Sequence, residues 1–190
     1  MDKFFNFIKP YLDFIDSGKL YREPFSWIYI VISVLNLVLP LYMLISSVIN
    51  GVFAAGFNFA IAFLLVWIVI AFTGWLGFQL WWNRSKRVIA ISEEGADFVA
   101  TPVFAHFIQT FGEWAGTCLA IVGFFATVIF NIFFGKDAFW FASMIGLGAF
   151  QGGWINLVFL PILGFFIIIF SRFIAESARA LAAIANNTRK

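Results

Sequence analysis

Charged and apolar positions are sharply separated along this chain. No charged residue lies between Glu23 and Arg84, and the 60 intervening positions are enough for two membrane spans of about 20 residues each. Gly and Asn gather near the middle of this stretch, between Asn50 and Asn58, where they indicate a turn. We therefore expect two spans, over residues 27–49 and 59–82.

The second half of the chain repeats this pattern. A third span is expected over residues 115–134, ending before Lys136, and a fourth over residues 154–171, ending before Arg172. The stretch 138–153 between them is uncharged, but its four glycines disfavour one long straight helix. We expect a non-cytoplasmic loop, a short interfacial helix or a re-entrant piece at this position.

The composition places the chain in lipid. Hydrophobic residues make up 63% of the sequence and charged residues only 12%, with a mean hydropathy of +0.96, whereas soluble domains are about 45–50% apolar and about 25% charged. The predicted fold class is therefore all-α, an integral membrane four-helix bundle in a single membrane domain over residues 1–190. A net charge of +2 gives no indication of a nucleic-acid partner.

The basic residues predict how the bundle is oriented. All but Lys136 of the 12 Lys and Arg residues lie in the two tails or in the segment after the second span. Because cytoplasmic segments are enriched in Lys and Arg, both termini are predicted to be cytoplasmic. The first apolar run is too long for a cleavable signal peptide. We expect a multi-pass protein of the cell (inner) membrane.

Three segments outside the spans have helical patterns. Residues 4–16 separate apolar from polar side chains on two helical arcs, which is typical of an interfacial amphipathic helix that anchors the chain or has a regulatory role. Residues 83–114 form a predicted cytoplasmic loop that turns at 93–95, followed by a helix that starts at Thr101-Pro102 and enters the third span. The Ala-rich stretch 172–187 predicts a helical extension that is solvated or pairs with a partner.

The helix entering the third span carries a polar stripe. Spacings of three, four and seven residues put five polar side chains within about 100° of one another, and Asn131 continues the stripe near the far end. Glu113 is the central member, because a carboxylate at the edge of a span can bind cations or exchange protons. The alternative is that Glu113 lies at headgroup level, beside water or a basic loop residue. The candidate ion path consists of His106, Gln109, Thr110, Glu113, Thr117 and Asn131.

Two similar strings, NLVLP and NLVFLP, place an Asn before a Pro in the first and fourth spans. Proline frees a backbone carbonyl, so Asn36 with Pro40 and Asn156 with Pro161 indicate either kinks around a site at mid-membrane or polar packing between helices.

A GxxxG pattern in the third span adds a packing signal. Small residues at this spacing let two helices approach closely. Gly112 and Gly116 therefore predict close helix packing or self-association, without distinguishing between them.

The sequence holds no pattern typical of catalysis or cofactor binding. Cys118 and His106 are the sole residues of their types, which excludes an intrachain disulfide and a thiolate zinc cluster within one chain. No GxSxG, HExxH or GxGxxG is present. We predict no catalytic residue, no metal and no cofactor, and an enzyme is the least favoured class.

Two functional hypotheses follow. The first is an oligomeric channel- or transporter-like protein for a small ion or solute, with Glu113 at its cytoplasmic mouth. The second is a non-transporting membrane scaffold or accessory subunit of a larger complex, which the absence of charge deep in the spans favours. The expected partners are the lipid bilayer and either further copies of the chain or another membrane protein.

Overall fold

The computed structural model describes residues 8–16, 19–91, 100–150 and 153–188, and within these ranges it contains helices and turns but no strand. Four long helices dominate. They are α3 (Lys19–Ile49), α4 (Phe57–Ile89), α5 (Ala100–Phe134) and α7 (Asn156–Thr188). Each belongs to a stretch long and apolar enough to cross a membrane. The predicted all-α membrane fold with four spans is therefore confirmed.

Shorter elements complete the described chain. The helix α2 (Lys9–Asp16) precedes α3, and the seven-residue helix α6 (Ala138–Met144) follows α5. Three 3₁₀ turns lie around α6 and before α7: η2 (Gly135–Asp137), η3 (Gly148–Phe150) and η4 (Gly153–Ile155). The structure thus places a short helix in the glycine-rich segment that the sequence left open.

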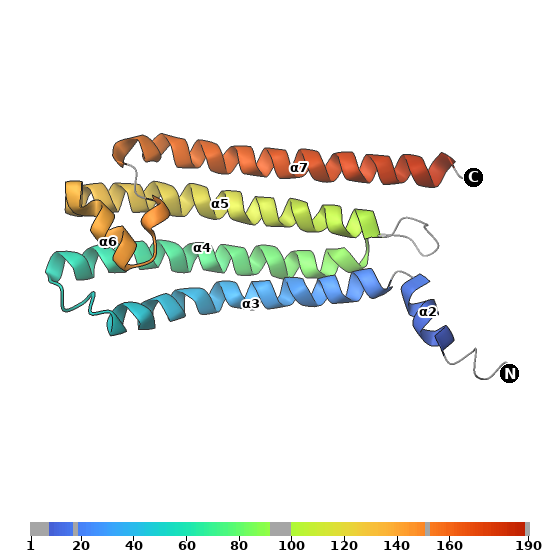
Figure 1. Cartoon of the computed structure of the whole chain (residues 1–190), viewed down its shortest axis with the longest axis horizontal. Helices are drawn as coiled ribbons and strands as arrows, with labels where there is room; N and C mark the ends of the chain where they lie inside the picture. Colours follow the sequence, from blue (N-terminus) through green and yellow to red (C-terminus); the bar gives the residue numbers. More distant parts are fainter. Residues whose placement is uncertain (1–7, 17–18, 92–99, 151–152, 189–190) are drawn as a thin grey trace.

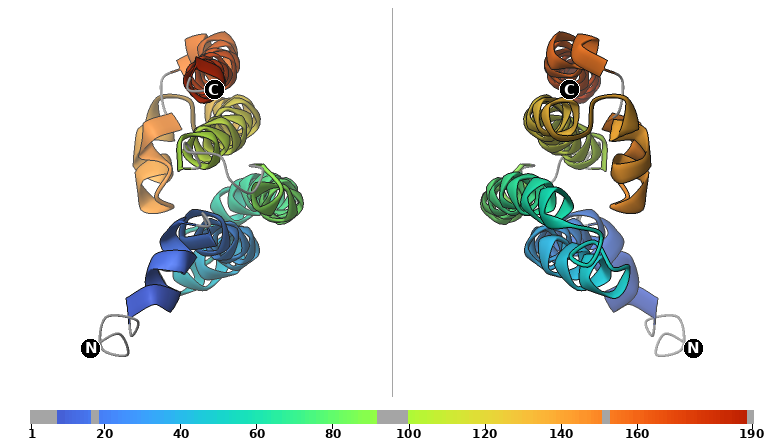
Figure 2. Two further views of the ribbon diagram at one scale, coloured as in Figure 1. Left: turned by 90° about the vertical axis from the view of Figure 1, so that its right-hand side faces the viewer. Right: turned by 90° about the vertical axis from the view of Figure 1, so that its left-hand side faces the viewer.

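The four long helices run antiparallel and follow one another in chain order, α3, α4, α5 and α7 (Figure 1). Seen end-on, they lie along an arc rather than in a closed ring, with α6 on one side of it (Figure 2). The main contacts join α3 to α4, α4 to α5 and α5 to α7, while α3 and α5 touch only slightly. The four-helix bundle is consequently open along its length.

Glycines bring α5 and α7 together. A Cβ atom at Gly116 would collide with the carbonyl oxygen of Gly164, and one at Gly164 would collide with that of Gly116. A Cβ atom at Gly112 would likewise collide with the Ser171 side chain. The GxxxG pattern is therefore used inside the chain, where the absence of side chains lets the two backbones touch.

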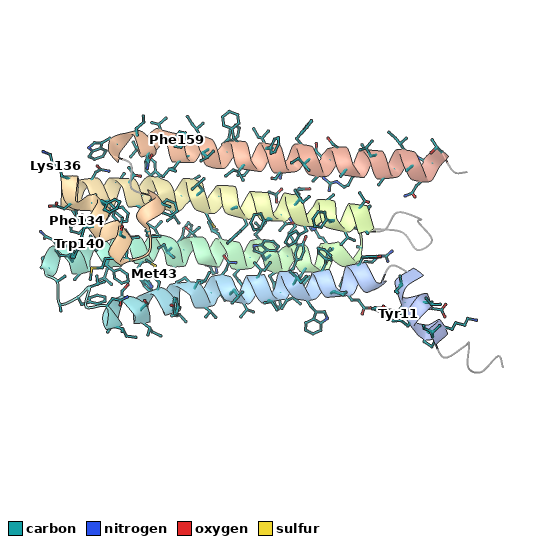
Figure 3. All side chains as sticks on the ribbon, in the orientation of Figure 1. Tyr11, Met43, Phe134, Lys136, Trp140 and Phe159 are labelled. Carbon is teal, nitrogen blue, oxygen red and sulfur yellow. The ribbon has the colours of Figure 1, made fainter. Side chains whose placement is uncertain are left out.

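The two ends of the bundle differ in charge. The first residues of α3 and the C-terminal halves of α4 and α7 carry most of the basic residues of the described helices, and they lie together at the end of the bundle where α5 begins. We call this the basic end (Figure 1). Lys136 and Trp140 lie at the opposite end, which we call the α6 end, whereas Tyr11 of α2 lies at the basic end (Figure 3). This arrangement fits the predicted grouping of the basic segments, and the side of the membrane stays a prediction.

The α6 end has an apolar core. Phe141 of α6 is fully buried, with its ring centroid 4.3 Å from that of Phe134 and 5.7 Å from that of Phe130. The connection from α3 to α4 also lies at this end. It turns at Gly51 and Gly56, whose positive φ angles favour glycine. The buried cluster consists of Val52, Ala62, Phe63, Val66, Ala126, Ile129, Phe130, Phe141, Ala142 and Ile145.

Some predicted segments lie partly outside the described residues. Of the predicted amphipathic helix, α2 covers Lys9–Asp16, and its Tyr11 and Leu12 are exposed. Residues 4–7 and the predicted turn at 93–95 lie outside the described ranges. Interfacial binding by this helix stays a prediction.

Candidate functional site

A buried ion-pair cluster centres on Glu113 of α5. Its Oε2 lies 2.7 Å from an Arg84 guanidinium nitrogen on α4, and its Oε1 lies 2.7 Å from Arg172 on α7. Oε1 also accepts hydrogen bonds from Arg172 Nε at 2.8 Å and from Gln109 Nε2 at 2.9 Å. One carboxylate therefore joins three helices.

Helical spacing explains how the cluster forms. Gln109 and Glu113 are four residues apart and share one face of α5, while Arg172 and Arg179 are seven apart and share one face of α7. Arg179 donates to Gln109 Oε1 at 2.9 Å, so the amide links a third guanidinium to the carboxylate. The cluster therefore spans about one turn of α5 and about two turns of α7.

The charges of this cluster do not balance. Two guanidinium groups contact one carboxylate, and a third is linked to it through Gln109. The Glu113 side chain is 10% exposed, against 17% for Arg84 and 53% for Arg172. Pairing offsets the cost of taking the Glu113 charge out of water, which would be several kcal/mol for an unpaired ion. The excess positive charge lies on the exposed, Arg172 side.

His106 belongs to a second buried group in the same half of the bundle. Its Nδ1 lies 2.8 Å from the hydroxyl of Tyr29 on α3, and both side chains are buried. The Tyr29 ring packs edge-on against Trp81 of α4 with centroids 4.9 Å apart. Nε2 of His106 has no hydrogen-bond partner among the described residues. This group joins α3, α4 and α5 through aromatic contacts and one side-chain hydrogen bond.

The remaining residues of the predicted stripe mostly bond to their own helix. Thr110 and Thr117 donate to the carbonyl oxygens of His106 and Glu113, four residues earlier. Asn131 similarly donates to the Thr127 carbonyl oxygen. Asn131 lies 18 positions beyond Glu113, about 27 Å along a helix, and the structure does not bring it to the cluster.

Asn36 and Pro40 do lie at an interhelical contact. The Asn36 side-chain oxygen accepts from Trp114 Nε1 at 2.8 Å and its amide nitrogen donates to the Ile32 carbonyl oxygen. Pro40 cannot donate to the Asn36 carbonyl, and Gly74 of α4 fits directly against that oxygen. These contacts join α3 to α4 and α5, and the role of the pair stays a prediction.

Asn156 and Pro161 occupy a different level. Asn156 begins α7 and donates to the Phe150 carbonyl oxygen at 3.4 Å, and Pro161 follows in the second turn. Asn36 and Pro40 lie past the middle of α3 instead. The two similar strings therefore do not form one shared site.

Sequence reasoning identified Glu113 but not its partners. Arg84 and Arg172 marked only the ends of charge-free runs, and neither Tyr29 nor Trp114 was predicted to be a partner of the polar residues. Their positions near span ends are the signal that could have been used, because a carboxylate in the third span requires a cation at a similar depth. In the described part of the chain, no three His, Cys, Asp or Glu side chains gather into a metal site.

Comparisons with known proteins found no relative. A scan of protein-family models, a search of curated proteins and a search of solved structures each gave no match to this chain.

Proposed function

We propose that this multi-pass membrane protein is a non-transporting scaffold or accessory subunit of a larger membrane complex. The observation that carries the proposal is the full engagement of Glu113, whose two carboxylate oxygens accept four contacts from Arg84, Arg172 and Gln109. Two guanidinium groups on one carboxylate leave a net positive charge, which repels an approaching cation. In this proposal Glu113 is a tether that holds α4 and α7 to α5.

The α6 end supports the same proposal. Its buried cluster is composed of aliphatic and aromatic side chains, with no polar or charged member among the described residues. An ion crossing this region would lose its hydration without gaining polar contacts, at a high cost. A continuous hydrated path through a single copy of the chain is therefore disfavoured.

The open arc provides surfaces for assembly. Because α7 packs mainly on α5, its outer face is left apolar and exposed, including Phe159, Phe165 and Phe166. Further copies of the chain or another membrane protein could pack there in place of lipid. In line with the basic residues, we place the protein in the cell (inner) membrane with both termini cytoplasmic.

Flux measurements test this proposal. Proteoliposomes containing the full chain are expected to pass Na⁺, K⁺, H⁺ and Cl⁻ no faster than protein-free vesicles. Glu113→Gln should leave these values unchanged but lower the free energy of unfolding by about 1–3 kcal/mol, because it weakens two ion pairs. The exposed Glu176→Gln is the matched control. Ion flux in the wild type that is lost in Glu113→Gln would refute the scaffold role.

Copy number and partners form the second arm of the test. Native mass spectrometry from lipid nanodiscs should reveal a defined homo-oligomer or a stoichiometric membrane partner. A chain that remains monomeric and alone under mild extraction contradicts the proposal.

Transport through an oligomer is the second candidate function. The observation in its favour is the excess of guanidinium groups beside the half-exposed Arg172, which suits a small anion better than a cation. Chloride flux that disappears in Arg179→Gln would select this alternative.

A further inference from the structure

A cavity of about 480 Å³ lies between α3, α4 and α5. Asn36, Pro40 and Met43 line it from α3, Thr73 and Gly74 from α4, and Trp114, Cys118 and Val122 from α5. Its volume falls within the range of about 300–1,000 Å³ that is typical of ligand pockets.

The fold keeps this space open. Gly74 lets α4 pack tightly against the backbone of α3 at Asn36, and the cavity lies beside this contact, toward α5. A hydrogen bond between Tyr29 and His106 and another from Trp114 to Asn36 join α3 to α5 on one side of the cavity.

The α6 end closes the other side of the cavity. Ile145, Gly146, Leu147 and Phe150, which follow α6, line it there, and Met43 lies near α6 (Figure 3). The rim residues Leu39 and Tyr42 are 53% and 66% exposed. Because both lie well inside α3, the opening is at the depth of the apolar spans.

The cavity lining offers no charge and few free polar atoms. The Asn36 side chain is engaged by Trp114 and by the Ile32 carbonyl, and the Thr73 hydroxyl donates to the Val69 carbonyl. A polar ligand would therefore lose its hydration without compensating hydrogen bonds. Only an apolar occupant matches this lining.

We propose that this cavity binds the hydrocarbon chain of a membrane lipid, which enters past Leu39 and Tyr42 and lies between α3 and α5 beneath α6. The occupant is a flexible apolar chain, either an acyl chain of a phospholipid or an isoprenoid tail. This inference is independent of the scaffold role, since a transporter could hold the same lipid.

Photo-crosslinking tests the proposal in the full chain. In proteoliposomes doped with a phospholipid that carries a diazirine on its acyl chain, adducts should concentrate on the peptides holding Met43, Cys118 and Leu147. Phe159, on the outer face of α7, reports ordinary contact with surrounding lipid (Figure 3). Ala115→Phe fills the cavity, so it should remove the lining adducts and leave those at Phe159.

A second readout uses the sole cysteine, Cys118, which lines the cavity and is free. In delipidated protein, phospholipid at about ten times its dissociation constant should slow Cys118 alkylation by N-ethylmaleimide about tenfold, because only empty sites react. Leu119→Phe provides a second filled variant if Ala115→Phe fails to fold. Both variants are compared with the wild type by thermal unfolding in detergent.

The outcomes separate the possible occupants. Competition by a phospholipid identifies an acyl chain, and competition by a polyprenyl alcohol alone identifies an isoprenoid tail, so that either result supports the site. Lining adducts no more frequent than those at Phe159, or unchanged in Ala115→Phe, overturn it. Cross-links from Cys118 to a second copy of the chain also overturn it, because protein would then fill the cavity.

Discussion

The two ends of the bundle hold the same helices together by different means. At the α6 end, α4, α5 and α6 pack through buried aliphatic and aromatic side chains such as Phe63 and Phe141. At the basic end, Arg84, Glu113 and Arg172 join α4, α5 and α7 through directional ion pairs. Lipid offers little hydrophobic force between spans, so close packing and polar contacts must do this work. Each end should therefore lose stability through a different kind of substitution.

Removing the Phe141 side chain should have the largest effect. Phe141→Ala leaves a void at the centre of the apolar cluster, and we expect the free energy of unfolding to fall by about 3 kcal/mol. Unfolding by SDS in mixed micelles measures this change. Phe159→Ala, on an exposed face, is the control and should change it little. Equal losses in the two variants would mean that the α6 end has no packed core.

Breaking the ion-pair cluster should have an intermediate effect. In a double-mutant cycle, Arg84→Gln and Glu113→Gln are expected to show a coupling energy of about 1–2 kcal/mol, since each removes the same contact. The same SDS titration provides the four values. Lys86→Gln, which changes an exposed cation two residues away, should show no coupling to Glu113→Gln. A coupling energy of zero between Arg84→Gln and Glu113→Gln would contradict the proposed role of Glu113 as a tether.

The smallest effect is expected for the hydrogen bond between α3 and α5. Tyr29→Phe keeps the ring but removes the hydroxyl beside His106, at a cost of about 0.5–1.5 kcal/mol. Thermal unfolding in detergent is precise enough for the comparison, with the exposed Tyr42→Phe as the matched control. No difference between the two variants would show that this contact contributes no stability.

The sequence predicted where the helices lie in the chain better than how each helix is turned about its own axis. Charge-free runs revealed four spans because the lipid-embedded part of each helix excludes charge. The stripe around Glu113 was also predictable, since it follows from the helical period alone. The helices that face Glu113 were not predictable. Arg84 and Arg172 are far from it in the chain, and no local pattern sets how each helix is turned.

The glycine contact was predictable from the sequence, but the cavity was not. Gly112 and Gly116 signalled a close contact, but the pattern does not name its partner, which proved to be α7 through Gly164. The space beside Cys118 arises from the distance between α3 and α5. This distance depends on how the other helices pack, so no local sequence pattern predicts it.

The chain-order arrangement of the spans has a consequence for biosynthesis. As each span enters the membrane, the span inserted just before it is one of its packing partners, so assembly proceeds without long-range searching. Glu113 meets Arg84 as soon as α5 is in place, whereas Arg172 arrives only with the last helix. The carboxylate thus has one cation during synthesis and gains the second when the final span docks.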